Sequence, residues 1–445
     1  MTIETTLRPT AADAPRPQRA QPVAVAIIGL LFFIFGFVTW LNGSLIPFLK
    51  IVCDLDYAEA FLVTFAFYIA YTVMALPMSG VLARTGYRNG MALGLGIMAV
   101  GALIHIPAAF LASFPLFLLG LFTIGTGLTV LQTASNPYIV LLGPPESAAK
   151  RISMMGVVNK AAGVIVPMVF ASLIMAELGH VGTVAAEHPT SEVQHLLAGR
   201  LMLPYLAMAA ILLVLVAFVR FAPLPDVAPE RAEDRHDGWR LFDQPRFVLG
   251  VVTIFAYMGM EVMAGDTIGV FGQHLGVANF LSLTSYTMGF MVLGYILGIL
   301  LIPRVVTQRT ALRMSGAAGL LATLGVLLSS PQSSALSQAL WGWSAVPVIP
   351  DPVFFVAIMG LAHALVWPTV WPFALKALGD ATPRASAFLI MAISGGALIP
   401  LLFGWLSTRL PSMQQAYVIA LPCYAMVLFY GWKGCTMTAW RGRAS

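Results

Sequence analysis

Apolar segments of about 20 residues recur along the whole chain, and they limit its folds more than any other feature. Each segment is long enough to cross a hydrocarbon layer of roughly 30 Å as a helix. Of the 445 residues, 59% are hydrophobic and 10% are charged, whereas soluble domains average about 25% charged residues. The sequence therefore predicts an all-α polytopic membrane protein whose first partner is the lipid bilayer.

The apolar runs and the breaks between them predict twelve transmembrane helices. We expect them near residues 23–49, 60–83, 90–113, 115–142, 152–177, 199–222, 247–273, 280–303, 310–330, 352–376, 386–408 and 414–433. A charged stretch separates the sixth span from the seventh. The expected organisation is a cytoplasmic tail (1–22), a six-helix bundle (23–222), a cytoplasmic linker (223–246), a second six-helix bundle (247–433) and a cytoplasmic tail (434–445).

The distribution of basic residues predicts the orientation of these spans. If both termini are cytoplasmic, all but four of the 24 Lys and Arg residues lie on the cytoplasmic side. Lys50, Arg200 and Arg409 fall on the other side, and Lys160 falls inside a span. This asymmetry follows the positive-inside rule. It also accounts for the net charge of +5, so we expect no nucleic-acid partner.

An internal repeat supports the division into two groups of six spans. The fifth span has Arg151, Gly163 and Pro167, and the eleventh has Arg384, Gly396 and Pro400 at the same spacings. Both follow a span that contains a proline well inside it, Pro137 and Pro368. Two parallel halves related by an axis along the membrane normal are a transporter architecture, with the substrate site between the halves.

Amide side chains inside the first six spans are candidate binding residues. Asn42, Gln132, Asn136 and Asn159 each carry donor and acceptor atoms. Such groups are costly in a membrane unless they find partners, so they usually face a cavity. They suit a neutral polyhydroxylated ligand, and Gln132 and Asn136 share one helix face at i and i+4. We therefore interpret them as contacts to a sugar.

Tryptophans accompany the polar residues. Trp40 lies two residues before Asn42, and Trp367 and Trp371 follow His363. Sugars present apolar C–H faces that can lie on flat aromatic rings, so these tryptophans are candidate sugar contacts. The alternative is that each fills space or belongs to an interfacial belt.

Two acids inside the seventh span, Glu261 and Asp266, are candidate proton-coupling residues. Desolvation favours the neutral form of a buried carboxyl group, and a carboxyl group that changes protonation between conformations can couple a proton to transport. Five residues apart, the two side chains point roughly 140° away from each other on an ideal helix. Both can line one cavity only if the helix breaks at Gly265.

Structural roles remain open for these ionisable residues. Glu261 could form an ion pair with Lys160 or a hydrogen bond with His363. His363 is also a candidate ligand contact in a central cavity. Lys160 could extend toward the membrane surface, pair with an acid or touch the substrate.

Four stretches resemble the fucose–galactose–hexose branch of the major facilitator superfamily, especially its bacterial glucose/galactose and N-acetylglucosamine transporters. They are FFIFGFVTWLNGSLIPFLK (32–50), LQTASNPYIVLLGPPESAAKRISMMGVVNKAAGVIVP (131–167), MEVMAGDTIGVFG (260–272) and GLAHALVWPTVWPFALKALG (360–379). The resemblance, from about residue 25 to 430, implies the twelve-helix, two-bundle fold, sugar uptake by alternating access, and proton coupling. It also implies that Gln132 and Asn159 are site residues.

The chain departs from this family at several site positions. Fucose symporters carry a glutamate where this chain has Gln132 and an aspartate where it has Gly43. Because a glutamine cannot take up a proton, we expect Glu261 or Asp266 to couple the proton instead. His363 stands where we expect the most similar transporters of this family to carry an asparagine, and this difference can change sugar preference.

The resulting hypothesis is a monomeric, secondary active transporter in a bacterial inner membrane that imports a hexose or N-acetylhexosamine with protons. Sodium coupling, uncoupled transport and export of drugs or metabolites by the same superfamily are the alternatives. We expect no enzyme, cofactor or metal, because neither the three widely spaced cysteines nor the histidines form a ligand pattern.

Overall fold

A computed structural model describes residues 22–142, 148–181, 199, 201–225, 241–302, 304–376, 378 and 381–440. The expected N-terminal tail apart from its last residue, positions 226–240 of the linker and positions 441–445 of the C-terminal tail lie outside these residues.

The described regular structure is helical throughout. The first half contains α1 (Pro22–Val52), α2 (Tyr57–Ala60), α3 (Leu62–Phe110), α4 (Phe114–Leu141), α5 (Ala148–Val181) and α8 (Met202–Phe221). The second half begins with α9 (Pro245–His274), η3 (Phe280–Ser282), α10 (Thr284–Leu301), α11 (Gln308–Leu328), α12 (Ala335–Trp341), α13 (Asp351–His363) and α14 (Val366–Leu375). It ends with α15 (Thr382–Met391), η5 (Ala392–Ser394), α16 (Gly395–Arg409), α17 (Met413–Ala416), η6 (Tyr417–Ile419), α18 (Ala420–Trp432) and η7 (Gly434–Thr436).

The prediction of twelve spans is confirmed within the described residues. The long helix α3 contains most of the second span (Tyr57–Met78) and all of the third (Arg84–Phe110), and its backbone departs from helical geometry at Gly86, near the start of the third. Gly86 has φ 75°, a left-handed conformation that a residue without a Cβ adopts at low cost. The last three spans are each built from two shorter helices, namely α13 with α14, α15 with α16, and α17 with α18.

The tenth span is interrupted directly after His363. Helix α13 ends at His363 and α14 begins at Val366. Pro368 accounts for this break, because its ring clashes with the carbonyl group four residues earlier and it cannot donate a hydrogen bond to it. In contrast, α4 continues through position 137 to Leu141, so the two prolines of the repeat do not have the same effect.

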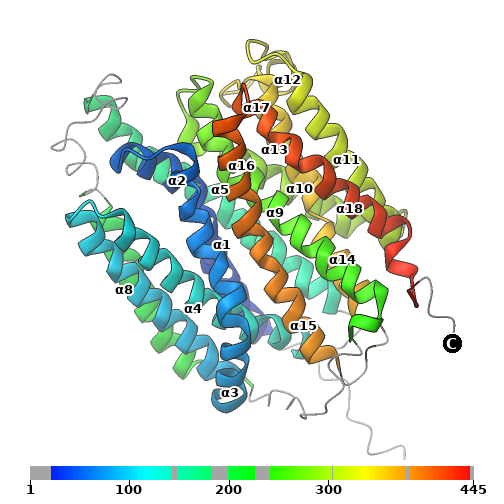
Figure 1. Ribbon diagram of the computed structural model, residues 1–445. Helices are drawn as coiled ribbons and strands as arrows, with labels where there is room; N and C mark the ends of the chain where they lie inside the picture. The colour runs from blue at the N-terminus through cyan, green and yellow to red at the C-terminus, as the bar shows by residue number, and fades with distance from the viewer. Residues whose placement is uncertain are drawn as a thin grey trace, which may run out of the picture.

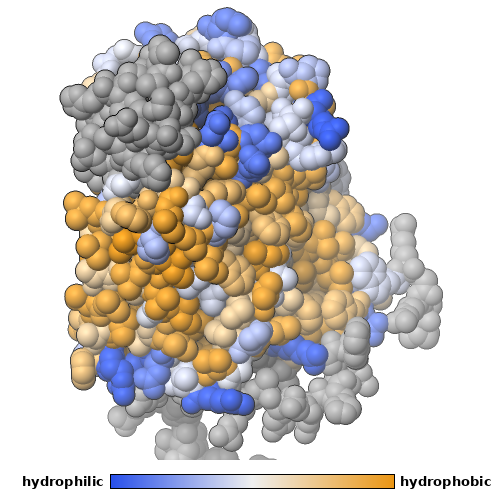
Figure 2. All heavy atoms as spheres, turned by 60° about the vertical axis from the view of Figure 1, so that its left-hand side comes forward, coloured by the Kyte–Doolittle hydropathy of each residue, from blue (hydrophilic) through white to orange (hydrophobic). Residues whose placement is uncertain are grey.

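The outer surface matches a lipid environment. Figure 2 shows a broad apolar band bounded on both sides by hydrophilic residues. Large apolar side chains such as Leu203, Val214 and Leu321 are exposed to the surroundings. Contiguous apolar surface of this extent is typical of contact with a membrane.

The spans form two groups that meet along α1, α3 and α5 on one side and α9, α10 and α16 on the other. In Figure 1, α4 and α8 lie at one flank, α11 and α18 at the other, and α1, α16 and α9 between them. The two glycines of the repeat both lie at this junction. A Cβ on Gly163 would meet Met288 of the second group, and a Cβ on Gly396 would meet Tyr68 of the first.

We call the end of the bundle where α1 and α9 terminate the distal face. Several contacts join the two groups in this half of the molecule. The Ser44 hydroxyl donates a hydrogen bond to the carbonyl oxygen of Leu281 over 2.6 Å. The Phe61 and Phe403 rings meet edge to face, with centroids 5.7 Å apart. The structure is therefore closed at the distal face.

Glycine allows the closest approach at this closure. A Cβ on Gly43 of α1 would lie 2.3 Å from the Thr284 hydroxyl oxygen and 2.7 Å from the carbonyl oxygen of Gly265. Separations this short are not tolerated, so α1 can pack on α9 and α10 only because residue 43 lacks a side chain. Position 43 thus has no room for an acidic side chain.

Candidate functional site

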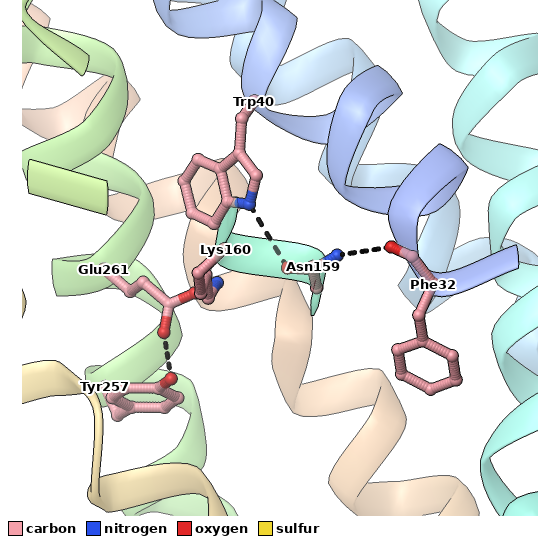
Figure 3. A network of polar contacts seen from close by, with 6 residues as sticks. All are labelled: Phe32, Trp40, Asn159, Lys160, Tyr257 and Glu261. Carbon is pink, nitrogen blue, oxygen red and sulfur yellow. Dashed lines mark hydrogen bonds and ion pairs between the residues drawn. The ribbon is translucent and has the colours of Figure 1, made fainter. Parts of the chain in front are cut away.

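A buried ion pair joins the two groups of spans near the middle of the molecule. The Lys160 ammonium nitrogen of α5 lies 2.5 Å from the Glu261 Oε1 atom of α9. Lys160 is 6% exposed and Glu261 is 2% exposed. The Tyr257 hydroxyl, one turn earlier on α9, donates a hydrogen bond to the other carboxylate oxygen. Figure 3 shows Lys160 and Tyr257 reaching different oxygens of the same carboxylate.

Trp40 and Asn159 continue this network into the first group. The Trp40 indole N–H donates to the Asn159 side-chain oxygen over 3.3 Å. The Asn159 amide nitrogen in turn donates to the carbonyl oxygen of Phe32, also over 3.3 Å. The Lys160 ammonium lies 4.1 Å from the Trp40 ring centroid, a cation–π contact. Four polar side chains and one indole ring therefore form a connected cluster (Figure 3), namely Asn159, Lys160, Glu261, Tyr257 and Trp40.

Aromatic residues extend the cluster into the second group. The Tyr257 and Trp367 ring centroids are 6.4 Å apart, and those of Trp367 and Trp371 are 5.2 Å apart. Both tryptophans are partly exposed, and the Trp371 N–H has no hydrogen-bond partner among the described residues. Two tilted, partly exposed indole rings offer a flat apolar surface to a ligand.

His363 contacts the cluster through Tyr257. The two rings meet edge to face, with centroids 6.1 Å apart. The His363 Nε2 atom forms a hydrogen bond of 2.6 Å with the Tyr424 hydroxyl, so the expected alternative of a hydrogen bond to Glu261 is not what the structure contains. The other ring nitrogen, Nδ1, is buried with no partner among the described residues.

Gln132 and Asn136 lie on α4, and Gln132 contacts one of a pair of tyrosines. The Gln132 amide nitrogen donates a hydrogen bond to the Tyr71 hydroxyl. Tyr71 stacks on Tyr68 with centroids 6.0 Å apart, and Tyr68 packs against Gly396 of the second group. Asn136 is partly exposed. Gln132 is thus connected to the junction of the two groups indirectly, through the Tyr71 and Tyr68 rings.

The structure does not bring Asn42 into the cluster. Asn42 lines a small cavity of about 10 Å³ inside the first group, together with residues of α1, α3, α4 and α8. Its amide nitrogen is buried without a partner in the described chain. Trp40 and Asn42 are two residues apart on α1, so their side chains point about 160° apart and lie in different environments.

Asp266 also lies apart from Glu261. Helix α9 continues through Gly265 to His274, so the break that would place both acids in one cavity is absent from it. Asp266 instead accepts a hydrogen bond of 2.8 Å from the Thr64 hydroxyl of α3, toward the distal face. The two acids of α9 therefore form separate contacts with the first group of spans, Glu261 with Lys160 and Asp266 with Thr64.

Some members of the site were not identified from the sequence. Thr64, Tyr68, Tyr71 and Tyr424 were not singled out, because hydroxyl groups are frequent in apolar spans and nothing in their spacing distinguishes them. The spacing of Tyr257 and Glu261 at i and i+4 was the available signal for their contact. In the described residues, no group of three or more His, Cys, Asp or Glu side chains gathers to hold a metal.

The fold and this central cluster define a class of protein, the secondary transporters built from two six-helix halves. The sequence profile of the Major Facilitator Superfamily matches residues 28–400. The chain belongs to the Major Facilitator Superfamily and, within it, to the fucose–galactose–hexose family of transporters. It is a multi-pass membrane transporter and not an enzyme.

Curated relatives match nearly the full chain. A glucose/galactose transporter of Brucella abortus biovar 1 (strain 9-941) is 31% identical over 425 residues, 94% of this chain and 95% of the relative. The L-fucose-proton symporter of Escherichia coli (strain K12) is 25% identical over 435 residues, 93% of each chain. The crystal structure of the transporter FucP in its outward conformation matches with a TM-score of 0.70 at 22% identity, covering 94% of this chain and 99% of that one. The structural likeness confirms the predicted fold.

Proposed function

We propose that this transporter imports a hexose or N-acetylhexosamine together with protons across a bacterial inner membrane. Relatives described as glucose/galactose transporters and as L-fucose-proton symporters support a sugar substrate and proton coupling. The distribution of Lys and Arg supports cytoplasmic termini. On this orientation the distal face is periplasmic, and the structure corresponds to the state closed toward the periplasm.

The observation that carries the proposal is the polar cluster between the two groups of spans. Asn159, Lys160 and Glu261 lie there beside the Trp40 ring, with donors and acceptors in close proximity. A sugar hydroxyl both donates and accepts, so it can replace one of these hydrogen bonds without leaving a buried group unpaired. Trp367 and Trp371 offer flat faces for the C–H surface of the ring.

Contacts from both groups explain how binding assists the conformational change. Lys160 belongs to the first group, and Glu261 and Tyr257 belong to the second. A sugar held between them gains its full set of hydrogen bonds only when the two groups approach. A ligand shifts an equilibrium between states by its difference in affinity for them, so substrate would favour the closed intermediate through which transport passes.

Uptake into proteoliposomes tests the proposal. Purified protein would be reconstituted and supplied with labelled glucose, galactose, fucose and N-acetylglucosamine, with and without an imposed pH gradient. We expect accumulation of at least one sugar above its external concentration, which an uncoupler abolishes. Failure to transport any hexose or hexosamine above empty liposomes would refute the sugar proposal.

The same assay separates the alternative coupling modes. An imposed sodium gradient at constant pH would drive accumulation by a sodium symporter, and an uncoupled carrier would only equilibrate the sugar. Export of drugs or other metabolites is the remaining candidate. Resistance that is unchanged when the gene is deleted would argue against drug export.

A further inference from the structure

Asp266 is buried where the two groups of spans close on each other. It is 0% exposed, and its Oδ2 atom accepts a hydrogen bond from Thr64 of the opposite group. The neighbouring Gly265 carbonyl accepts from Thr284 over 2.7 Å, and Gly43 packs against the same carbonyl. Opening the distal face must separate Thr64 from Asp266, since they belong to different groups.

The environment of Asp266 does not suit a negative charge. Its second oxygen, Oδ1, has no hydrogen-bond partner among the described residues. Within the same residues, no Lys, Arg or His nitrogen lies within the 4.0 Å ion-pair distance of it. One hydroxyl donor cannot compensate for removing a carboxylate from water, a cost of several kcal/mol even in relaxed proteins. The closed face therefore favours the neutral acid.

The elements packed on this part of α9 contribute several titratable groups around Asp266. Helix α3 contributes the Tyr68 phenol, which also lies near Glu261. The η6 segment contributes the Tyr417 phenol, bonded to Thr267 over 2.7 Å. Tyr57 of α2 pairs with His274 near the distal end of α9, and Lys50 of α1 lies over the Tyr57 ring. From α10 and η3, the nearby polar groups are neutral hydroxyls.

Glu261 has the opposite requirement. Its charge is balanced by Lys160 and hydrogen-bonded by Tyr257. Protonation of Glu261 would leave Lys160 as an uncompensated buried charge. The two acids of α9 thus differ in function, because one is neutralised by a cation of the protein and the other needs a proton.

We propose that Asp266 takes up a proton from the periplasmic side before that side closes, so that the gate closes only on the neutral acid. A hydronium ion in the open vestibule transfers its proton to a carboxylate oxygen of Asp266, leaving water, and the side chain changes from charge −1 to 0. Thr64 then closes over it. This inference rests on the proposed function for its role in transport, and it assigns the entry of the proton to Asp266.

The distance across the periplasmic gate tests the inference without any sugar. Spin labels would be placed at Leu111 and Gln415, which are exposed on opposite groups at the distal end. The background would carry Ala at Cys53, Cys423 and Cys435. In the full-length protein in lipid nanodiscs, pulsed EPR should show the short distance gaining population as pH falls. Asp266→Asn should keep the short distance at every pH.

Ser44→Ala is the matched control. It removes another hydrogen bond across the same gate, to Leu281, but no titratable group. We expect weaker closure with the pH dependence retained. Asp266→Ser gives a second neutral variant if Asp266→Asn does not fold, as judged by thermal melting. A wild-type pH response that persists in the neutral variants, or a wild type with no response, would overturn the inference.

A response of the gate to sodium, and a response to pH without sugar accumulation, would each separate the gate inference from another proposal. Sodium at constant pH could close the wild-type gate and have no effect on the gate of the Asp266→Asn variant. In that case the site binds sodium and the proton assignment is wrong. If the gate responds to pH as expected but no sugar accumulates in proteoliposomes, the gate inference stands and the proposed substrate falls. With a sugar identified, Asp266→Asn should also lose proton-driven accumulation of that sugar in proteoliposomes.

Discussion

At the scale of single residues, the buried Lys160–Glu261 pair is the interaction whose loss should cost most. Its two charges come from different halves and are almost fully excluded from solvent. Removing one partner of a buried pair leaves the other uncompensated, whereas removing both does not. The effects of substituting Lys160 and Glu261 on the free energy of unfolding should therefore be strongly non-additive.

Lys160→Met and Glu261→Gln should each lower the free energy of unfolding by about 3–5 kcal/mol. The double variant should lose less than the more severe single variant, because no buried charge remains unpaired. Thermal melting in detergent measures the three variants against wild type. Additive losses would indicate that the two side chains do not interact in the folded protein.

Trp367 should contribute to substrate affinity through its ring. Trp367→Leu is expected to weaken sugar binding roughly five- to tenfold, equivalent to about 1–1.4 kcal/mol, by removing a flat surface beside Tyr257. Trp405→Leu is the control, because Trp405 is exposed on the outer surface. Isothermal titration with the transported sugar measures the dissociation constant of each variant. Equal effects of both substitutions would show that Trp367 does not contact the sugar.

At the scale of elements, the break between α13 and α14 sets the direction of the tryptophans relative to His363. Pro368→Ala would restore the missing N–H donor and relieve the clash with the carbonyl of residue 364. We expect a higher melting temperature and a several-fold lower uptake rate, since a straight span displaces Trp367 and Trp371. Pro372→Ala, in the exposed part of α14, is the control. An unchanged uptake rate in Pro368→Ala would show that the break has no part in transport.

The elements were largely predictable from the sequence, whereas their contacts were not. Hydrophobic length locates a span because the bilayer imposes it, and the confirmed spans differ from those expected by a few residues. Lys160 was a candidate partner of Glu261 because few charges lie inside the spans. The Asp266–Thr64 and Gln132–Tyr71 contacts join distant segments through common residue types. They depend on helix rotation and tilt, which hydropathy does not encode.

At the scale of the whole molecule, closure of the distal face depends on Gly43. Gly43→Val should shift the protein toward the state that is open at the distal face and reduce uptake about tenfold or more, since its side chain would overlap Thr284 and the Gly265 carbonyl. Gly289→Val is the control, because a Cβ at Gly289 meets nothing within 4 Å. Labelling of a cysteine placed at Leu111, at the distal end, measures the shift. Wild-type uptake by Gly43→Val would contradict the assigned contact.

The Lys160–Glu261 pair has an electrical consequence for the carrier. Its charges are opposite and 2.5 Å apart, so together they form a small dipole and no net charge in the membrane. A charge that crosses the membrane does work of about 2.3 kcal/mol per 100 mV. Membrane voltage should therefore do little work on this pair when the two halves move relative to each other. If Asp266 takes up the coupled proton as proposed, membrane voltage should act mainly on the step at which Asp266 gains or loses that proton. Transport of a neutral sugar would then carry an inward current of protons only.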